Sequence, residues 1–300
     1  MNADAAVMSL KARMRNRARE FSLPPHVVLQ NYAFERFLAR LAASPWKTKL
    51  VLKGGLLIAQ LHGLASRSTM DMDATLRDAP LDEGTAIRAV TDICALDAGD
   101  GFEMRVVSCE PIRATDQYGG FRVHFDAALY EMVVHLSVDI STGDAMTPAP
   151  VEYALSGLFS PDAKLRVLGY NRETILAEKL EAILSLGVYG TRPRDYYDAW
   201  LLSRDDIDEA RLREAFRATC RHRGTETLIA DGPDRLRSIA ASDALAGHWR
   251  RYARQFPYAR GLPFSQVVNA VEKLYSRAVG DDDASTRPAS PGEASAAQPS

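Results

Sequence analysis

Two aspartates separated by one residue are the side chains in this sequence best suited to chemistry. Asp71 and Asp73 follow a short run, Lys53-Gly54-Gly55, in the first third of the 300-residue chain. On a strand, successive side chains point to opposite faces, so the two carboxylates would share one face. Neighbouring carboxylates repel each other unless a cation lies between them, and oxygen-rich sites suit Mg²⁺. The pair therefore predicts a magnesium site.

The glycine pair upstream adds a second possible ligand contact. Gly54 and Gly55 let the backbone adopt positive φ and approach a ligand closely. If a helix starts there, its free N–H groups and its dipole favour phosphate. Lys53 is then either a phosphate ligand or a solvated lysine at a strand end, and the glycines alone also fit an ordinary strand-to-helix turn. Beside two carboxylates, the turn favours metal-assisted transfer from a nucleotide.

A third carboxylate lies on the polar face of a predicted strand over residues 131–140. Its apolar face carries Val134, Leu136, Val138 and Ile140. Asp139 points the other way. If this strand neighbours the strand of Asp71 and Asp73, three carboxylates converge and can hold two Mg²⁺ ions that clamp attacking and leaving oxygens. The alternative is that the aspartates belong to a solvated turn.

Arg67 and Thr69 precede the acidic pair. Arg67 lies four residues before Asp71, where it would neutralise the acidic group or touch a triphosphate. A structural salt bridge is the alternative for Arg67. We place Thr69 with the nucleotide site, and its alternative is local packing or hydrogen bonding.

A lysine falls within the apolar stripe of a predicted helix at 173–184. Helical spacing groups Lys179 with Ile175, Ala182, Ile183 and Leu186. The lysine is therefore not on the solvated face where Glu178 and Glu181 could lie. An unpaired buried ammonium is costly, so Lys179 needs an anionic partner such as a triphosphate. Alternatively, its stem snorkels to solvent.

The next helix begins with two carboxylates among arginines and tyrosines. In Arg192-Pro193-Arg194-Asp195-Tyr196-Tyr197-Asp198, proline suits a first helical turn. Asp195 and Asp198 are three residues apart and share a face. Asp195 could simply complement the helix dipole. Asp198 could orient Lys179 or act on the attacking group.

Composition excludes several classes of protein. Apolar residues make up 46% of the chain, which is ample for a core, and 37 basic against 39 acidic residues carry no overall nucleic-acid signal. No apolar run reaches the roughly 18 residues that span a membrane. Three widely spaced cysteines fit a reducing compartment, and we recognise no export signal, so we expect a cytoplasmic protein.

Hydrophobic spacing predicts the elements that position these residues. We expect helices at 9–20, between Pro25 and Pro45, at 55–65 and at 82–96, and strands at 50–52, around 71–73, at 102–110, 120–128 and 131–140. The short link at 128–131 predicts an antiparallel pair. Residues 141–170 are expected to form loops with a short strand near 164–167. Helices should follow to residue 279, with breaks at 187–193, 224, 232–233 and 261–263. The predicted units are an α/β lobe (1–170), a helical lobe (171–279) and a disordered tail (280–300).

Basic residues gather in three places. They are Lys11, Arg13, Arg15, Arg17 and Arg19; Arg211, Arg213, Arg217, Arg221 and Arg223; and Arg250, Arg251, Arg254 and Arg260. Trp249, Tyr252 and Tyr258 are interleaved with the last cluster. Arginine with aromatic residues can bind RNA through phosphate contacts and stacking. Solvated helix faces give the same pattern.

Three ordered stretches resemble the AbiEii/AbiGii toxin family of bacterial nucleotidyltransferases, distant relatives of the DNA polymerase β superfamily. They are LVLKGGLLIAQLHGLASRSTMDMD (50–73), ETILAEKLEAIL (173–184) and RPRDYYDAWLL (192–202). The segment NYAFERFLARLAAS (31–44) is also similar, and the resemblance extends over roughly residues 10–275. One departure is Gly54-Gly55 where the superfamily has a Gly-Ser turn, which leaves backbone N–H groups for phosphate.

The resemblance implies residue roles. Asp71 and Asp73 would hold Mg²⁺, Asp139 would be the third acidic residue, and Lys179 with Asp198, joined by Asp195, would form the second catalytic group. Lys53, Gly54, Gly55, Arg67 and Thr69 would bind the nucleotide. The expected fold is a nucleotidyltransferase-like mixed sheet with flanking helices, followed by a helical C-terminal lobe, with the active site in the cleft between them.

The resemblance also implies a biological role. The protein would be the toxin of a toxin–antitoxin pair, neutralised by a cognate antitoxin, and would transfer a nucleoside monophosphate from a nucleoside triphosphate to an acceptor hydroxyl. The resemblance and the basic clusters favour the 3′ end of transfer RNA as acceptor, and we expect a monomer. Two alternatives stay open: a nucleotidyltransferase acting on a small molecule, as in antibiotic modification, and a non-catalytic nucleotide-binding module.

Overall fold

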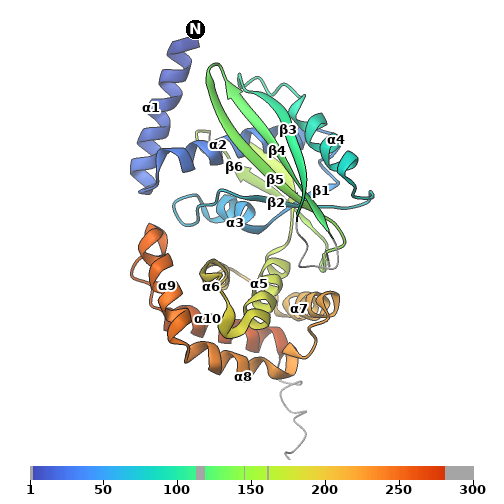
Figure 1. The fold of residues 1–300 in the computed structure, drawn as a ribbon, viewed down its shortest axis with the longest axis vertical. Coiled ribbons are helices and arrows are strands. Elements are labelled where there is room, and N and C mark those ends of the chain that lie inside the picture. Colours follow the sequence, from blue (N-terminus) through green and yellow to red (C-terminus); the bar gives the residue numbers. More distant parts are fainter. Residues whose placement is uncertain (1–2, 113–118, 145, 161, 281–300) are drawn as a thin grey trace, which may run out of the picture.

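A seven-stranded mixed sheet and ten α-helices make up the described part of the chain, which in this computed structural model comprises residues 3–112, 119–144, 146–160 and 162–280. The strand order is β3-β4-β5-β2-β1-β7-β6. The sheet and its flanking helices come first, and the later helices gather below it (Figure 1). The mixed α/β class and the helical C-terminal part are thus as predicted. Apart from Gly280, the tail predicted to be disordered lies outside the described residues.

The element bounds follow the predicted order. The strands are β1 (Leu50–Lys53), β2 (Met72–Leu76), β3 (Glu103–Ile112), β4 (Gly120–Leu129), β5 (Met132–Ser141), β6 (Val151–Ser156) and β7 (Lys164–Gly169). The first helices are α1 (Ala3–Phe21), α2 (Pro25–Ala43), α3 (Gly54–His62) and α4 (Glu83–Cys94). The later helices are α5 (Arg172–Leu186), α6 (Pro193–Leu202), α7 (Glu209–Arg223), α8 (Leu228–Ala240), α9 (Asp243–Gln255) and α10 (Phe264–Val279). Two 3₁₀ turns, η1 (Gly187–Tyr189) and η2 (Pro257–Ala259), connect them. None of the described helices combines the length and apolarity needed to cross a bilayer.

Strand pairing brings distant residues to one level of the sheet. β2 runs antiparallel to β1 and parallel to β5, with Lys53 opposite Asp73 and Asp73 opposite Asp139. The expected neighbourhood of these two strands is therefore confirmed. Hydrogen-bonded strands lie about 4.8 Å apart, so the backbone itself places the three side chains close together.

The predicted alternation on β5 is also confirmed. Val134, Leu136, Val138 and Ile140 are all buried. β4 and β5 form the predicted antiparallel pair. On the covered face, Phe37 of α2 packs against Phe125 of β4, with ring centroids 4.7 Å apart. The opposite face is left for polar side chains, and Asp139 stands on it.

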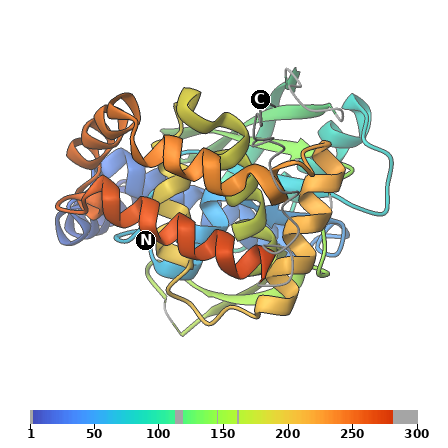
Figure 2. The ribbon, with the colours of Figure 1, turned by 90° about the horizontal axis from the view of Figure 1, so that it is seen from below.

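The junction between the last strand and the first later helix is short. Tyr170 donates its backbone N–H to the Leu52 carbonyl across 3.0 Å. Asn171 then caps α5 by accepting a hydrogen bond from the Thr174 N–H, and its side-chain amide donates to the Pro148 carbonyl at 2.6 Å. Seen from below, the helices after this junction cover much of the sheet (Figure 2).

Strand β6 was not predicted, because residues 141–170 read as loops with one short strand. β6 is an edge strand that pairs only with β7. Of its six residues, Leu155 alone is buried. A strand with a single buried side chain shows little hydrophobic alternation, which explains why the sequence pattern missed it.

The break predicted at Gly232-Pro233 is wrong, because both residues lie inside α8. Proline lacks the N–H that would bond the carbonyl four residues earlier. The Tyr275 hydroxyl of α10 donates to that carbonyl, Ile229, at 2.6 Å. A Cβ on Gly232 would overlap the Tyr275 ring, so this glycine lets α10 approach closely enough to supply the missing donor. The other predicted breaks coincide with chain turns.

This compensation is testable by a double-mutant cycle. Tyr275→Phe should lower the free energy of unfolding by about 1 kcal/mol, because the buried carbonyl loses its donor. In a Pro233→Ala background the new N–H can bond Ile229, so the same change should cost less. Urea denaturation measures both values, and an equal cost in the two backgrounds would contradict this account of the helix.

Candidate active site

One cavity of about 590 Å³ lies where the sheet meets the later helices. Its lining comes from the sheet (β1, β2, β4 and β5), the start of α3, the loop before β2, and the later helices α5, α6, α7 and α9 with the residues next to them. Of the residues predicted for the site, it contains Lys53, Gly54, Gly55, Arg67, Thr69, Asp71, Asp73, Asp139, Lys179 and Asp195. Asp198 alone is not at its surface. The fold therefore gathers almost the whole predicted set in one place.

Position 54 must be a glycine, because its backbone passes close to an aspartate. Gly54 has φ +66°, in the left-handed region that favours glycine. A Cβ at this position would overlap the Asp73 carboxylate. A Cβ on Gly55 would lie 3.0 Å from both Arg67 Nη2 and Thr69 Oγ1. The first residues of α3 can thus offer their free N–H groups to the cavity at the level of Asp73.

Asp73 is the carboxylate best placed for a cation. Burial raises its pKa; Asp139 and Asp71 raise it further, while Lys53 and Lys179 act in the opposite direction, and the net pKa is raised. Within the described residues, no ion pair or hydrogen bond of its side chain is found. A half-buried carboxylate without a direct partner among the described side chains, beside two others, fits the oxygen ligands that Mg²⁺ prefers.

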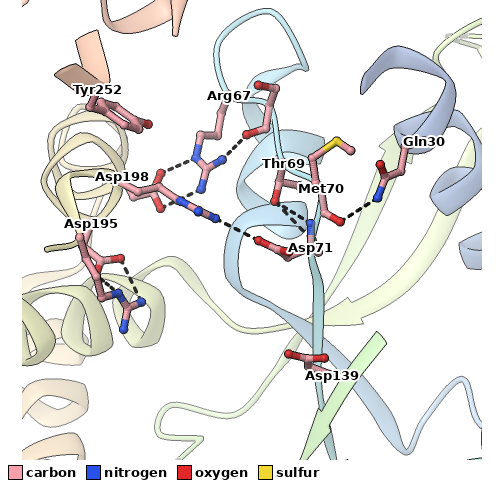
Figure 3. Close-up of polar contacts among 12 residues, drawn as sticks. Gln30, Arg67, Thr69, Met70, Asp71, Asp139, Asp195, Asp198 and Tyr252 are labelled. Atoms are coloured by element: carbon pink, nitrogen blue, oxygen red, sulfur yellow. Dashed lines mark hydrogen bonds and ion pairs between the residues drawn. The ribbon is translucent and has the colours of Figure 1, made fainter. Parts of the chain in front are cut away.

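The other two carboxylates are engaged by arginines. Arg194 Nη1 of α6 lies 3.1 Å from Asp71 Oδ2 (Figure 3). Arg122 of β4 holds both oxygens of Asp139 at 2.7 Å. Asp71 also precedes β2 rather than lying in it, so the expected shared strand face does not include it. Among the described side chains, no group of three or more His, Cys, Asp or Glu is arranged to hold a metal ion.

Lys179 finds its anionic partners on α6. Its Nζ lies 2.7 Å from Asp195 Oδ1 and 3.3 Å from Asp198 Oδ2. Burial lowers the pKa of Lys179, but the two carboxylates raise it more strongly, and the net pKa is raised. The lysine is therefore a fixed positive charge at the cavity wall, as its place in the apolar stripe led us to expect.

The solvated face suggested for Glu178 and Glu181 is wrong. Glu181 is 3% exposed and pairs with Arg223 of α7, while Glu178 lines the cavity. Helix α7 packs on this side of α5 and brings Arg223 with it. The helix is thus covered on two sides, which periodicity within α5 alone does not show.

Arg67 makes the structural salt bridge that was one of its two alternatives. Its side chain is 1% exposed, and its Nε and Nη2 donate to Asp198 at 2.6 and 3.2 Å (Figure 3). Asp198 is fully buried. Burial raises its pKa, Arg67 and Lys179 lower it more, and the net pKa is lowered. Asp198 therefore positions Arg67 and Lys179 and does not itself reach a ligand in the cavity.

The loop that carries Arg67 and Asp71 is hydrogen-bonded to α6, to α2 and within itself. Tyr197 of α6 donates its hydroxyl to the Ser66 carbonyl at 2.6 Å. From α2, Asn31 donates to the Thr69 carbonyl and Gln30 to the Met70 carbonyl, each at 2.8 Å. The Thr69 hydroxyl accepts the Asp71 N–H at 3.2 Å, the local hydrogen bond offered as its alternative role.

Lys53 is held by a polar network that sequence reasoning missed. Its Nζ donates to Ser141 Oγ at 2.7 Å and to Asp144 Oδ2 at 2.5 Å. Thr75 and Tyr170 also donate their hydroxyls to Asp144, at 2.6 and 2.8 Å. Burial raises the pKa of Asp144, but Lys53 and these hydroxyls lower it to about 2. Asp144 lies in the segment expected to be loop, where no periodicity marks it.

Comparison with known proteins finds one matching family and similar solved structures. The family model described as "Nucleotidyl transferase AbiEii toxin, Type IV TA system" matches residues 36–273. The crystal structure of JHP933 from Helicobacter pylori has 15% identity and a TM-score of 0.46, covering 85% of this chain and 94% of that one. The structure of a candidate nucleotidyltransferase from H. pylori has 16% identity and a TM-score of 0.46, covering 85% and 97%. No protein of curated function matches the chain.

The requirement for glycine at position 54 can be separated from backbone strain. Gly63 has φ +84°, and no atom lies within 4 Å of the point that a Cβ would occupy there, so Gly63→Ala carries strain alone. Gly54→Ala adds the overlap with Asp73 and should cost at least about 1 kcal/mol more in urea denaturation. Adding Asp73→Ala should recover part of this difference. Equal costs for the two glycine variants would contradict the close approach.

The buried ion pair predicts strong coupling. Asp198→Leu leaves Arg67 buried without its main partner and should lower the free energy of unfolding by about 3–5 kcal/mol. The double change Arg67→Met with Asp198→Leu should cost less than the sum of the single changes. The exposed pair Arg166–Glu152 is the control, and its loss should change stability by less than about 1 kcal/mol. Simple additivity at Arg67 and Asp198 would refute the coupling.

Proposed function

This chain belongs to the AbiEii nucleotidyl transferase toxin family of type IV toxin–antitoxin systems. We propose that it catalyses the following reaction in its cavity. The protein transfers a nucleoside monophosphate from a nucleoside triphosphate to an acceptor hydroxyl, with Mg²⁺ as cofactor. The acceptor is the 3′ end of transfer RNA. The enzyme acts as a monomer in the cytoplasm, and a cognate antitoxin relieves its toxicity.

One observation carries this proposal. Asp71, Asp73, Asp139 and Lys179 come from widely separated parts of the chain and line the same cavity at the start of α3. Phosphoryl-type transfer needs little covalent chemistry from the protein and depends on charge neutralisation and orientation. A group of carboxylates facing a fixed ammonium and a helix N-terminus supplies both requirements. A non-catalytic binding module gives no reason for such convergence.

Each residue that lines the cavity has its own part in the proposed transfer. The acceptor oxygen attacks the α-phosphorus, the bond from phosphorus to the bridging oxygen of pyrophosphate breaks, and the hydroxyl proton passes to a carboxylate of the cavity. Lys179 and Lys53 offset phosphate charge, and the N–H groups at Gly54 and Gly55 orient the triphosphate. Asp71 and Asp73 would hold Mg²⁺, which supplies further charge neutralisation and a template for the phosphates.

Two residues take positioning roles in this scheme. Asp198 is fully buried, so it orients Lys179 and does not act on the attacking group. Arg67 bonds Asp198 and fixes the loop before Asp71. Arg67 was expected to offset phosphate charge itself. Because its Nε and Nη2 already donate to Asp198, we assign it this positioning role instead.

A labelling experiment tests the proposal. The protein is incubated with each labelled nucleoside triphosphate, Mg²⁺ and total bacterial RNA. We expect label on transfer RNA, and at least about 100-fold less with Asp71→Ala or Lys179→Ala, because each removes transition-state charge stabilisation. Asp206→Ala, another exposed aspartate, is the matched control and should keep full activity.

Separate outcomes would overturn the proposal. Label only on a small molecule would favour the antibiotic-type alternative, and no label with any nucleotide would favour a binding module. Growth inhibition on expression should be lost with the same two variants. Circular dichroism must show that both remain folded, since an unfolded variant would argue for a structural role of that side chain.

A further inference from the structure

Two helices on one side of the molecule carry exposed cations without partners. On α1 they are Lys11, Arg15 and Arg19; on α9 and the segment after it they are Arg250, Arg251, Arg254 and Arg260. Within the described ranges, none of these seven side chains forms an ion pair or side-chain hydrogen bond. We call them the α1/α9 cations. Both views show α1 and α9 on the same flank (Figures 1 and 2).

Helix α1 presents its charges as a single stripe. Lys11, Arg15 and Arg19 are spaced by four residues, so they share a face and span about 12 Å along the axis. Leu10, Met14 and Ala18, about 100° around the helix from this stripe, are buried, and α1 packs on α2. The orientation of the stripe is therefore fixed by the core. The other two arginines of this helix are engaged, Arg13 over the Phe159 ring and Arg17 with Glu20.

Helix α9 connects these charges to the cavity. Its last residue, Gln255, and the following Phe256 line the cavity wall. Arg250, Arg251 and Arg254 precede them on exposed positions of the same helix. The chain carries no Asp or Glu from residue 244 to residue 271. If one end of a polyanion occupies the cavity, the rest of it would extend along α9. There it would meet positive charge and no carboxylate from residues 244–271.

The third basic cluster has a different environment. On α7, Arg211 pairs with Asp208, Arg213 with Glu209, and Arg223 with Glu178 and Glu181. Most of its charge is neutralised within the protein, so it offers less attraction to phosphate. The three basic clusters look alike in the sequence, but the structure pairs several arginines of α7 with carboxylates and leaves the α1/α9 cations without such partners.

Burial of the aromatic residues narrows the choice of partner. Trp249 is 2% exposed and Tyr252 6%, and Trp249 donates its Nε1–H to the Leu262 carbonyl at 2.7 Å. Of the three aromatic residues interleaved with this cluster, Trp249 and Tyr252 are therefore buried, and Tyr258 is half-buried. Beside the exposed arginines of α9, no aromatic side chain of the described residues 249–260 is itself exposed, whereas the guanidinium groups are free to meet phosphates. Double-helical RNA is read in this way, by backbone contacts and shape.

We propose that the α1/α9 cations form the docking surface for the helical stem of the acceptor RNA, bound through its phosphates while its 3′ end lies in the cavity. The inference rests on the proposed function for the identity of the reacting end. It assigns RNA recognition to sequence-independent electrostatics on one flank of the enzyme. Stems of different sequence are then bound alike, and selection among RNAs is left to the end that enters the cavity.

Binding is the first test, because it does not depend on transfer. Fluorescence anisotropy measures the affinity of the full chain for a labelled RNA hairpin with a single-stranded 3′ end. The two test proteins are Lys11→Gln/Arg15→Gln/Arg19→Gln and Arg250→Gln/Arg251→Gln/Arg254→Gln. The control is Arg105→Gln/Arg166→Gln/Arg211→Gln, which removes the same charge from side chains that are 81%, 70% and 60% exposed elsewhere.

Each test protein should bind the hairpin at least about ten-fold more weakly than wild type, and the salt dependence should fall by about two to three ion equivalents, as expected for three lost phosphate contacts. The control should match wild type. Equal weakening by all three proteins would show an effect of net charge only, and unchanged affinity in both test proteins would show that RNA docks elsewhere. Either result overturns the proposal.

Kinetics then separate docking from chemistry. With transfer RNA as acceptor, the α9 variant should raise KM at least about ten-fold and leave kcat unchanged, because these residues do not touch the reacting atoms. The α1 variant should also raise KM for transfer RNA, whereas with a trinucleotide acceptor, which is too short to reach α1, its KM should equal that of wild type. Hairpin binding that depends on these cations without any transfer would uphold the docking surface and refute the proposed reaction.

Discussion

The buried contact between Arg67 and Asp198 is the interaction on which the cavity depends. Removing two charges from water costs several kcal/mol per ion, and only close pairing with good geometry offsets that cost. Here one carboxylate receives two guanidinium bonds and the Lys179 ammonium. The result ties the loop before β2 to α6 and fixes a lysine of α5 at the same point. Three segments distant in the sequence are thereby held in one geometry.

Charge around this cavity is arranged in two ways. At its rim, Asp71 and Asp139 are each neutralised by an arginine, Arg194 and Arg122. Deeper in, Asp73 has only more distant cations to offset it, and its pKa is raised by burial and by its neighbours. Of the three carboxylates, Asp73 is therefore the one whose charge is not offset by direct contact with a described side chain.

The parts of the site and the fold that could be predicted from the sequence are those marked by a pattern within a single helix, strand or turn. The glycine turn, the alternation on β5 and the apolar stripe of α5 mark most of the site residues through the element that carries each. Arg122, Asp144 and Arg194 have no such signal, because each acts through a partner far away in the chain. In the fold, β6 has one buried residue and therefore almost no hydrophobic pattern. Helix α8 continues through Pro233 because a hydroxyl from α10 replaces the missing N–H, and no nearby stretch of sequence contains that hydroxyl.

The two-residue connection at Tyr170 and Asn171 limits how the molecule can move. Its first residue is hydrogen-bonded to β1 and its second caps α5 while binding the Pro148 carbonyl, so neither is free to act as a hinge. Lys53 and Lys179 lie on opposite sides of this connection in the sequence and line the same cavity. Rotation of the sheet against the later helices at this connection would therefore have to break one of these hydrogen bonds.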